Sequence, residues 1–354
     1  MQAGILCDMN PVLKTTLCEL LGCEYPIIQT AMGWVADPAL VSASCNAGGF
    51  GFLAGAVMTP EEVEAGILAI KQKTDRPFGV NFHMYTPAAP AIIDLCIKNQ
   101  VRAVSYSRSP SREMVAKLKD AGIVCIPTVG ALKHAIKAVE MGADVVVVQG
   151  GEGGGHTGSV ASTILLPQVV DALSVPVVAA GGFKCGRGLV AALSYGAVGI
   201  AMGTRFLMSE ESPVPLQTKS RYVDVPTEQI IVSKKLDGMP QRMINNECLQ
   251  ELQQSSKLGM LMLAIKNGLV FTRQSGESLV SMLRSAWKMK KANDMTLGQT
   301  LMAANSPMMI QEAMVRGRPA QGILPSGQVA GTGSRKESIG YSAEPWQLMH
   351  DDIA

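Results

Sequence analysis

The sequence is poor in charge, in aromatic side chains and in clustered basic residues, and each shortage excludes a class of protein. Only 17% of its 354 residues are charged and 5% are aromatic, whereas 47% are hydrophobic. A chain of this composition can bury a large core, so it is globular. Its net charge is +2 and its positive residues are scattered, which excludes a basic surface for nucleic acid. Small soluble partners are expected instead.

Sequence patterns of membrane and disulfide-bonded proteins are also missing. No apolar run reaches the length of about 20 residues that a membrane span needs, and the N-terminus lacks the basic and apolar regions of a signal peptide. The eight cysteines form no C-x-x-C pair and have no histidine at ligand spacing. We therefore expect reduced thiols, no metal site, no membrane contact and a cytoplasmic location.

Short apolar runs alternate with amphipathic stretches between Tyr25 and Phe206, the pattern of repeated βα units around a parallel sheet. Eight runs qualify as strands, and they cover residues 26–30, 50–54, 78–82, 103–106, 123–127, 144–148, 175–179 and 199–202. Eight parallel strands predict an α/β protein with a (β/α)8 TIM barrel. A doubly wound sheet of six strands is the weaker alternative.

The alternation of apolar and amphipathic segments stops after Ser209, which predicts additional regions beyond the barrel. We assign residues 1–212 to the barrel, residues 213–305 to an added, mainly helical domain that covers the substrate, and residues 335–354 to a poorly ordered tail. Residues 306–334 are expected to return to the barrel, with the turn-rich 325–331 at its mouth. The methionine-rich segments 258–265 and 279–289 either adapt to an apolar substrate or are simply core.

Two glycine-containing loops follow the last two predicted strands. Gly181 and Gly182 come after the seventh, and Gly203 and Thr204 come after the eighth. In TIM barrels these loops often bind phosphate through backbone amides, and glycine permits the close approach. Two ordinary tight turns are the alternative. The favoured interpretation is a cofactor that carries a phosphate.

The sixth predicted strand leads into a glycine loop, residues 149–158, whose titratable side chains are Glu152 and His156. An isolated histidine is usually structural, but this loop has few packing side chains and lies at the sheet edge where α/β folds bind ligands. His156 is therefore a catalytic candidate, and Glu152 either orients it or is solvated. A dinucleotide fingerprint is rejected, because no acidic residue ends a strand about 20 positions later.

Polar and small residues follow three other strands at the same edge. Asn81 ends the third strand and Thr128 follows the fifth, where either side chain can contact the edge of a ring or cap a loop. The run from Ala31 to Trp34 follows the first strand and brings main chain to the mouth.

These residues resemble a known family. The segments 26–33, 46–51, 79–81, 149–156, 180–182 and 202–206 together are similar to the nitronate monooxygenase (2-nitropropane dioxygenase-like) family of FMN barrels. The resemblance implies that FMN lies across the barrel mouth and that His156 is catalytic. It further implies that the phosphate binds at Gly181, Gly182, Gly203 and Thr204, and that the rest of FMN contacts Ala31, Met32, Gly33, Asn81, Thr128, Gln149, Gly154 and Gly155.

Within that family, the segments 237–240, 302–305 and 324–331 most resemble the bacterial branch of flavin oxidoreductases that act on CoA esters from steroid ring degradation. The family implies an FMN-dependent oxidoreductase that oxidises a nitronate or related carbanion with O2. One alternative is an NAD(P)H-linked reductase or dehydrogenase acting on a CoA ester, an enoyl compound or a quinone. Another is a non-catalytic FMN-binding module.

Three further expectations accompany the resemblance. Gly153 stands where many monooxygenases have alanine, and Thr128 where some relatives have lysine, so the family name does not imply the substrate. A barrel resembling inosine-monophosphate dehydrogenase would need a cysteine in the loop after the sixth strand, and that loop has none. Apolar helices outside a barrel would suit a homodimer.

Overall fold

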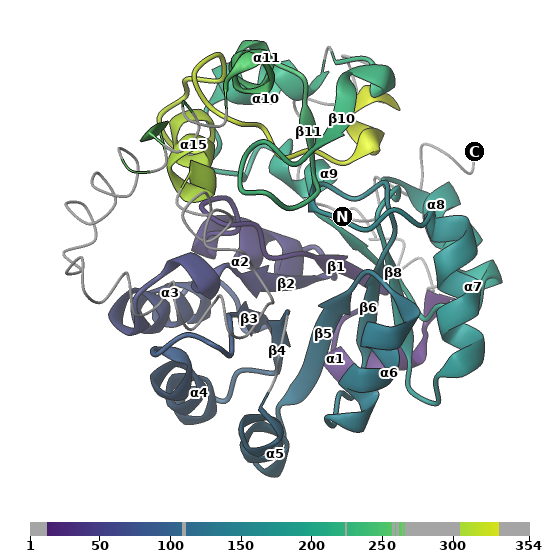
Figure 1. Ribbon diagram of the computed structural model, residues 1–354. Helices are drawn as coiled ribbons and strands as arrows, with labels where there is room; N and C mark the ends of the chain where they lie inside the picture. Colours follow the sequence, from purple (N-terminus) through teal and green to yellow (C-terminus); the bar gives the residue numbers. More distant parts are fainter. Residues whose placement is uncertain are drawn as a thin grey trace, which may run out of the picture.

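Eight parallel strands close into a barrel in the order β1-β2-β3-β4-β5-β6-β8-β9 (Figure 1). The structure, a computed structural model, describes residues 13–107, 111–223, 225–256 and 305–332 together with residues 259, 262, 263 and 265. The barrel strands are β1 (Ile27–Gln29), β2 (Phe50–Leu53), β3 (Gly79–Asn81), β4 (Ala103–Tyr106), β5 (Val124–Val129), β6 (Val146–Gln149), β8 (Val177–Ala180) and β9 (Ile200–Met202). The predicted TIM barrel is confirmed, and the six-stranded alternative is wrong.

Alternate side chains of these strands fill the barrel, as the pleat requires. The interior cluster contains Ile28, Phe50, Phe52, Ala103, Val124, Ile126, Val147, Val178, Ala180 and Ala201. Gly79 gives room to Phe52, because a Cβ at that glycine would lie 2.2 Å from the phenyl ring. Leu17 and Leu21 of α1 (Thr16–Leu21) join the same cluster and cover the amino end of the barrel. The carboxyl end remains for the functional site.

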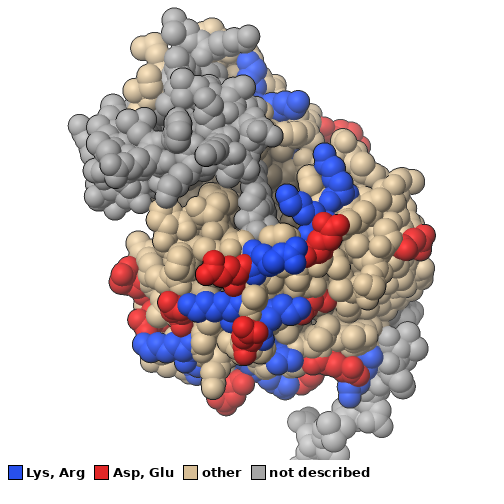
Figure 2. Space-filling model, turned by 60° about the horizontal axis from the view of Figure 1, so that its bottom comes forward, with Lys and Arg blue, Asp and Glu red and all other residues tan. Residues whose placement is uncertain are grey.

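Helices surround the barrel and bury its outer faces. They are α2 (Pro38–Asn46), α3 (Pro60–Lys71), α4 (Ala89–Lys98), α5 (Arg112–Asp120), α6 (Leu132–Glu140), α7 (Ser162–Ala172), α8 (Gly186–Ser194) and the short α9 (Thr204–Leu207). The expected capping box at Thr59 starts α3. Basic and acidic side chains are interspersed on the face of Figure 2, and ion pairs such as Lys98–Glu64 and Lys117–Asp94 join neighbouring helices. No described helix combines the length and apolarity needed to cross a lipid bilayer.

The remaining described residues lie beside the carboxyl end of the barrel. They form α10 (Leu216–Val223), β10 (Ile230–Ser233), β11 (Gln241–Ile244), α11 (Glu247–Gln254), α15 (Asn305–Met314), and the 3-10 helices η3 (Thr227–Gln229) and η4 (Gln328–Thr332). The sequence does not predict β11 or the antiparallel sheet β10-β11-β7, whose third strand β7 (Gly155–His156) belongs to the glycine loop. Residues 266–304, the second methionine-rich segment among them, and the tail lie outside the described residues. The division into domains stays a prediction.

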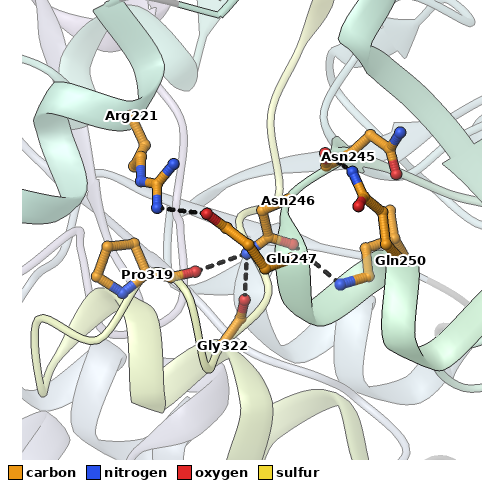
Figure 3. Close-up of polar contacts among 8 residues, drawn as sticks. Arg221, Asn245, Asn246, Glu247, Gln250, Pro319 and Gly322 are labelled. Carbon is orange, nitrogen blue, oxygen red and sulfur yellow. Dashed lines mark hydrogen bonds and ion pairs between the residues drawn. The ribbon is translucent and has the colours of Figure 1, made fainter.

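Side-chain contacts hold α11 against the returning segment (Figure 3). Asn246 caps the helix by accepting the amide of Leu249 at 3.1 Å, and its Nδ2 donates to the carbonyls of Pro319 and Gly322 at 2.6 and 2.8 Å. The guanidinium of Arg221 in α10 pairs with Glu247 at 2.8 Å. One asparagine therefore connects a helix start to a chain segment more than 70 residues later.

Candidate active site

Three polar residues predicted at strand ends face the barrel interior at its carboxyl mouth. Side chains alternate along a strand, and Thr128 and Gln149 follow the interior residues Ile126 and Val147 by two positions. Asn81 likewise follows Gly79, where an added Cβ would meet the interior ring of Phe52. Asn81 Nδ2 donates to the hydroxyl and carbonyl oxygens of Ser105 at 2.9 and 3.1 Å. Gln149 Nε2 donates to the His156 carbonyl at 3.0 Å. The interior of the barrel is therefore apolar along most of the strands and polar at their carboxyl ends.

The glycines after β8 have the backbone shape that the phosphate hypothesis needs. Gly181 and Gly182 have φ of 85° and 87°, in the left-handed region that disfavours other residues. A Cβ at Gly181 would lie 2.9 Å from the Gly150 carbonyl, so the loops after β6 and β8 approach each other closely there. A Cβ at Gly155, in contrast, would meet nothing within 4 Å.

The loop after β9 adjoins two other parts of the predicted site. A Cβ at Gly203 would lie 3.3 Å from the sulfur of Met32, which places the loops after β1 and β9 together. The Thr204 hydroxyl oxygen accepts the amide of Gly327 at 2.9 Å, so the returning segment lies on the barrel mouth. That segment also covers Gly154, where a Cβ would lie 2.6 Å from the Gly327 nitrogen.

The first loop holds the remaining predicted residues. Ala31 packs on the interior cluster, while Gly33 is adjacent to Val57, whose Cγ1 would lie 3.2 Å from an added Cβ. Trp34 adopts φ of 61°, an unusual value for a residue with a side chain. These contacts place the loop at the mouth, and they leave its role toward a cofactor a prediction.

Glu152 anchors the glycine loop to α7. Its carboxylate accepts the Ser162 amide at 3.0 and 3.1 Å, and the Ser162 hydroxyl lies 2.9 Å from Oε2 and 2.7 Å from the Gly181 carbonyl. A carboxylate suits this position because the first amides of a helix lack partners within the helix. Glu152 therefore neither orients His156 nor is simply solvated, and it instead holds the glycine loop to the start of α7.

His156 is half exposed and makes one close side-chain contact. Its side chain is 46% exposed, and Nε2 lies 2.8 Å from Oδ2 of Asp237, whose side chain is only 2% exposed. Asp237 belongs to the connection between β10 and β11, far from the barrel in sequence. An imidazole with one nitrogen held by a carboxylate can exchange a proton at the other.

Arg242 fixes the other side of the loop. Its Nε donates to the Gly151 carbonyl at 2.8 Å, and Nη1 donates to the Ile230 carbonyl at 3.0 Å. Burial lowers the pKa of this guanidinium, and the charge of nearby Glu152 acts in the opposite direction. Arg242 therefore ties the loop to the first strand of the small sheet.

Among the described residues, the predicted site coincides neither with a metal site nor with a separate surface cleft. Within the described part of the chain, no group of three or more histidine, cysteine or acidic side chains could hold a metal ion. A cleft of about 460 Å3 beside α10 and α11 includes none of the predicted site residues. Its lining consists of Gln217, Ser220, Arg221, Val225, Gln229, Ile244, Asn245, Asn246, Glu247 and Gln250.

Comparison with known proteins identifies the family. The family model described as nitronate monooxygenase matches residues 14–92 and 89–340. The chain belongs to the nitronate monooxygenase family. Its resemblance to that family, stated from the sequence, is confirmed, and so is the oxidoreductase class of this nitronate monooxygenase-family chain.

Named proteins and solved structures resemble this member of the nitronate monooxygenase family over most of its length. The chain is 49% identical, over 90% of both sequences, to (3aS,4S,5R,7aS)-5-hydroxy-7a-methyl-1-oxo-octahydro-1H-indene-4-carboxyl-CoA dehydrogenase of Rhodococcus jostii. It is 31% identical to a probable nitronate monooxygenase of Staphylococcus aureus, over 68% of this chain and 81% of that protein. Among solved structures, FabK from Thermotoga maritima aligns with a TM-score of 0.75 and 28% identity, over 96% and 95% of the two chains.

The partners of the predicted histidine in this family member are not evident from the sequence. Asp237 stands out only as part of a family-like segment, and the sequence predicts no role for Gln241 or Arg242. Residues 241–244 read Gln-Arg-Met-Ile, which lacks the regular alternation of apolar and polar side chains that predicts a strand. Nothing local indicated that this strand pairs with the glycine loop.

Proposed function

We propose that the chain is an FMN-dependent dehydrogenase of a CoA ester. The observation that carries this proposal is the 49% identity to the Rhodococcus CoA-ester dehydrogenase across 90% of both sequences. The relatives named probable nitronate monooxygenases are more distant, at 31% identity and 68% of this chain. This difference favours the CoA ester, held as an alternative from the sequence, over a nitronate with O2.

The barrel mouth fits FMN in shape and in chemistry. The loop of the left-handed Gly181 and Gly182 supplies backbone amides for a phosphate, and Gly203 and Thr204 lie on the neighbouring loop. The inward-facing Asn81, Thr128 and Gln149 supply hydrogen-bonding groups for a polar ring edge, and the open surroundings of Gly155 suit a planar ring. When bound, FMN supplies the acceptor for a hydride equivalent.

The protein's own residues then handle the proton. A dehydrogenation removes one proton and one hydride, and a C–H group next to the thioester carbonyl is acidic enough for an imidazole to assist. His156 takes that proton at Nδ1, while Gln149 and the pairing of β7 with β11 hold its backbone. An organic acceptor such as NAD(P)+ completes the cycle. A cytoplasmic location and a homodimer stay predictions.

Anaerobic mixing tests the proposal. Flavin-loaded protein is mixed with a saturated cyclic CoA ester that has a hydroxyl on the carbon next to the thioester-bearing carbon, and separately with propane-2-nitronate. We expect the flavin absorbance to bleach with the CoA ester and much more slowly with the nitronate. Bleaching by the nitronate alone would favour the monooxygenase instead. No bleaching by either donor or by NADH would indicate a non-catalytic flavin-binding module.

His156→Ala tests the proton step in the same assay. The variant should retain flavin and lose about 10²-fold or more in the rate of reduction, the scale of a lost general base. His134→Ala, an exposed change on α6, is the matched control and should keep the wild-type rate. Equal rates for the two variants would remove His156 from the mechanism.

A further inference from the structure

We infer that Asp237 is the positioning residue that fixes the proton of the His156 imidazole on Nε2 and so leaves Nδ1 as the basic nitrogen. The inference deepens the proposed function, because it assigns a second residue to the same site. It rests on that function only for the kinetic consequence. The hydrogen bond and the tautomer can be tested without any substrate.

The surroundings of Asp237 form a set of donors around an acceptor. Oδ1 accepts the Met239 amide at 3.0 Å, and Oδ2 accepts Gln241 Nε2 at 2.5 Å. The third neighbour is Nε2 of His156, at 2.8 Å from the same Oδ2. An ionised carboxylate only accepts hydrogen bonds, and a buried one needs them. The imidazole nitrogen therefore donates, which defines the tautomer.

The backbone register explains why these groups meet. In the pairing of β11 with β7, Gln241 lies opposite His156 and Arg242 lies opposite Gly155. The Thr157 amide also donates to the Pro240 carbonyl at 3.2 Å. Opposed residues in an antiparallel pair point to the same face. Gln241 and His156 consequently share a face of the sheet, and the turn before β11 brings Asp237 to both.

The chemical consequence concerns the nitrogen that is left. A neutral imidazole with its proton on Nε2 is an acceptor at Nδ1, so that nitrogen can take a proton from a substrate. The ring is also fixed in direction, because Asp237 is buried and held by two other donors. Without the carboxylate, the ring could populate both tautomers and several rotamers.

The first test needs only wild-type protein. The chain has four histidines, so ¹⁵N-histidine spectra are simple, and the His156 signals are identified by their loss in His156→Ala. At pH about 8, where an ordinary imidazole is neutral, we expect the His156 Nε2 signal to be that of a protonated nitrogen and the Nδ1 signal that of an unprotonated one. A proton on Nδ1 would overturn the inference, whether or not any substrate is turned over.

The second test uses Asp237→Asn in the flavin-loaded protein. We expect the His156 nitrogen signals to move toward a mixture of tautomers, and kcat for the CoA ester to fall about 10- to 100-fold, the scale of a misplaced catalytic group. KM and flavin retention should change little. Asp237→Glu, which restores a carboxylate, should recover part of kcat.

Asp94→Asn is the matched control, because Asp94 is exposed on α4 and pairs only with Lys117 among the described contacts. It should leave both the spectra and kcat unchanged. Unaltered His156 signals in Asp237→Asn, or a loss that Asp237→Glu does not recover, would contradict the positioning role. If wild-type protein oxidises no CoA ester while its Nε2 is protonated, the proposed function fails and the inference on Asp237 stands.

Discussion

At the scale of single residues, Gly181 combines a left-handed backbone with a close contact, and the two constraints can be separated. Its φ is 85° and an added Cβ would lie 2.9 Å from the Gly150 carbonyl, whereas Gly122 has φ of 75° and open space around the same position. Gly122→Ala should therefore lower the free energy of unfolding by about 1 to 2 kcal/mol through backbone strain alone. Gly181→Ala should cost roughly 1 kcal/mol or more beyond that and release the flavin. Urea unfolding and the flavin absorbance after gel filtration measure both effects, and equal behaviour of the variants would refute the contact argument.

The sequence predicted residues whose signal is local and missed those whose signal is not. His156 stands out because its loop contains few side chains that could pack in a core. Gly181 stands out because it follows the seventh strand, and the loops after strands seven and eight of TIM barrels frequently bind phosphate. Asp237 lies 81 residues from His156, and one aspartate after a strand has many ordinary roles. Glu152 was nearer in sequence and was considered first, yet it binds Ser162. Sequence distance could not decide between the two carboxylates.

At the scale of secondary-structure elements, α11 depends on one residue for more than its cap. Asn246 caps the helix and donates to the carbonyls of Pro319 and Gly322 (Figure 3). Asn246→Ala should reduce the free energy of unfolding by about 2 to 4 kcal/mol, the sum of a cap near 1 kcal/mol and two hydrogen bonds to a part-buried and a buried carbonyl. Ser111→Ala, which removes only a cap from α5, is the control and should cost about 1 kcal/mol. Chemical denaturation measures both, and equal losses would show that the two carbonyl contacts contribute nothing.

Secondary-structure elements also differ in whether local sequence patterns predict them. The barrel strands were predicted within a few residues, because runs such as Val145 to Val148 are typical of strands buried on both faces. Strand β7 consists of a glycine and a histidine, neither of which favours a strand, so only its pairing with β11 creates it. The sheet that carries His156 was consequently beyond local sequence patterns.

At the scale of the whole molecule, buried thiols predict how stability changes with pH. Burial raises the pKa of Cys45, Cys96 and Cys125 from 9.0 to about 12. Between pH 9 and 12 the unfolded chain therefore releases protons that the folded chain keeps. The contribution of these three thiols to the free energy of unfolding is fully present below pH 9. Above pH 9 the free energy of unfolding falls by up to about 1.4 kcal/mol per thiol and pH unit.

Cys96→Ala isolates one of these thiols from the lysines and tyrosines that also titrate. The variant should be less stable at neutral pH because of its cavity, yet its stability should fall less steeply above pH 9. Urea midpoints measured from pH 8 to 11 provide the comparison. Parallel curves for the wild type and Cys96→Ala would exclude the buried thiol as a cause.

The pairing of β7 with β11 joins the glycine loop of the barrel to a hairpin that lies much later in the sequence. A fragment ending at residue 212 would keep every glycine expected to bind FMN, but it would lack β11, which pairs with the His156 backbone, and Asp237, which contacts the imidazole. His156 and the carboxylate that contacts it thus come from separate stretches of chain. Exchanging the 230–244 hairpin between relatives would accordingly change the surroundings of His156 while leaving the barrel sequence unaltered.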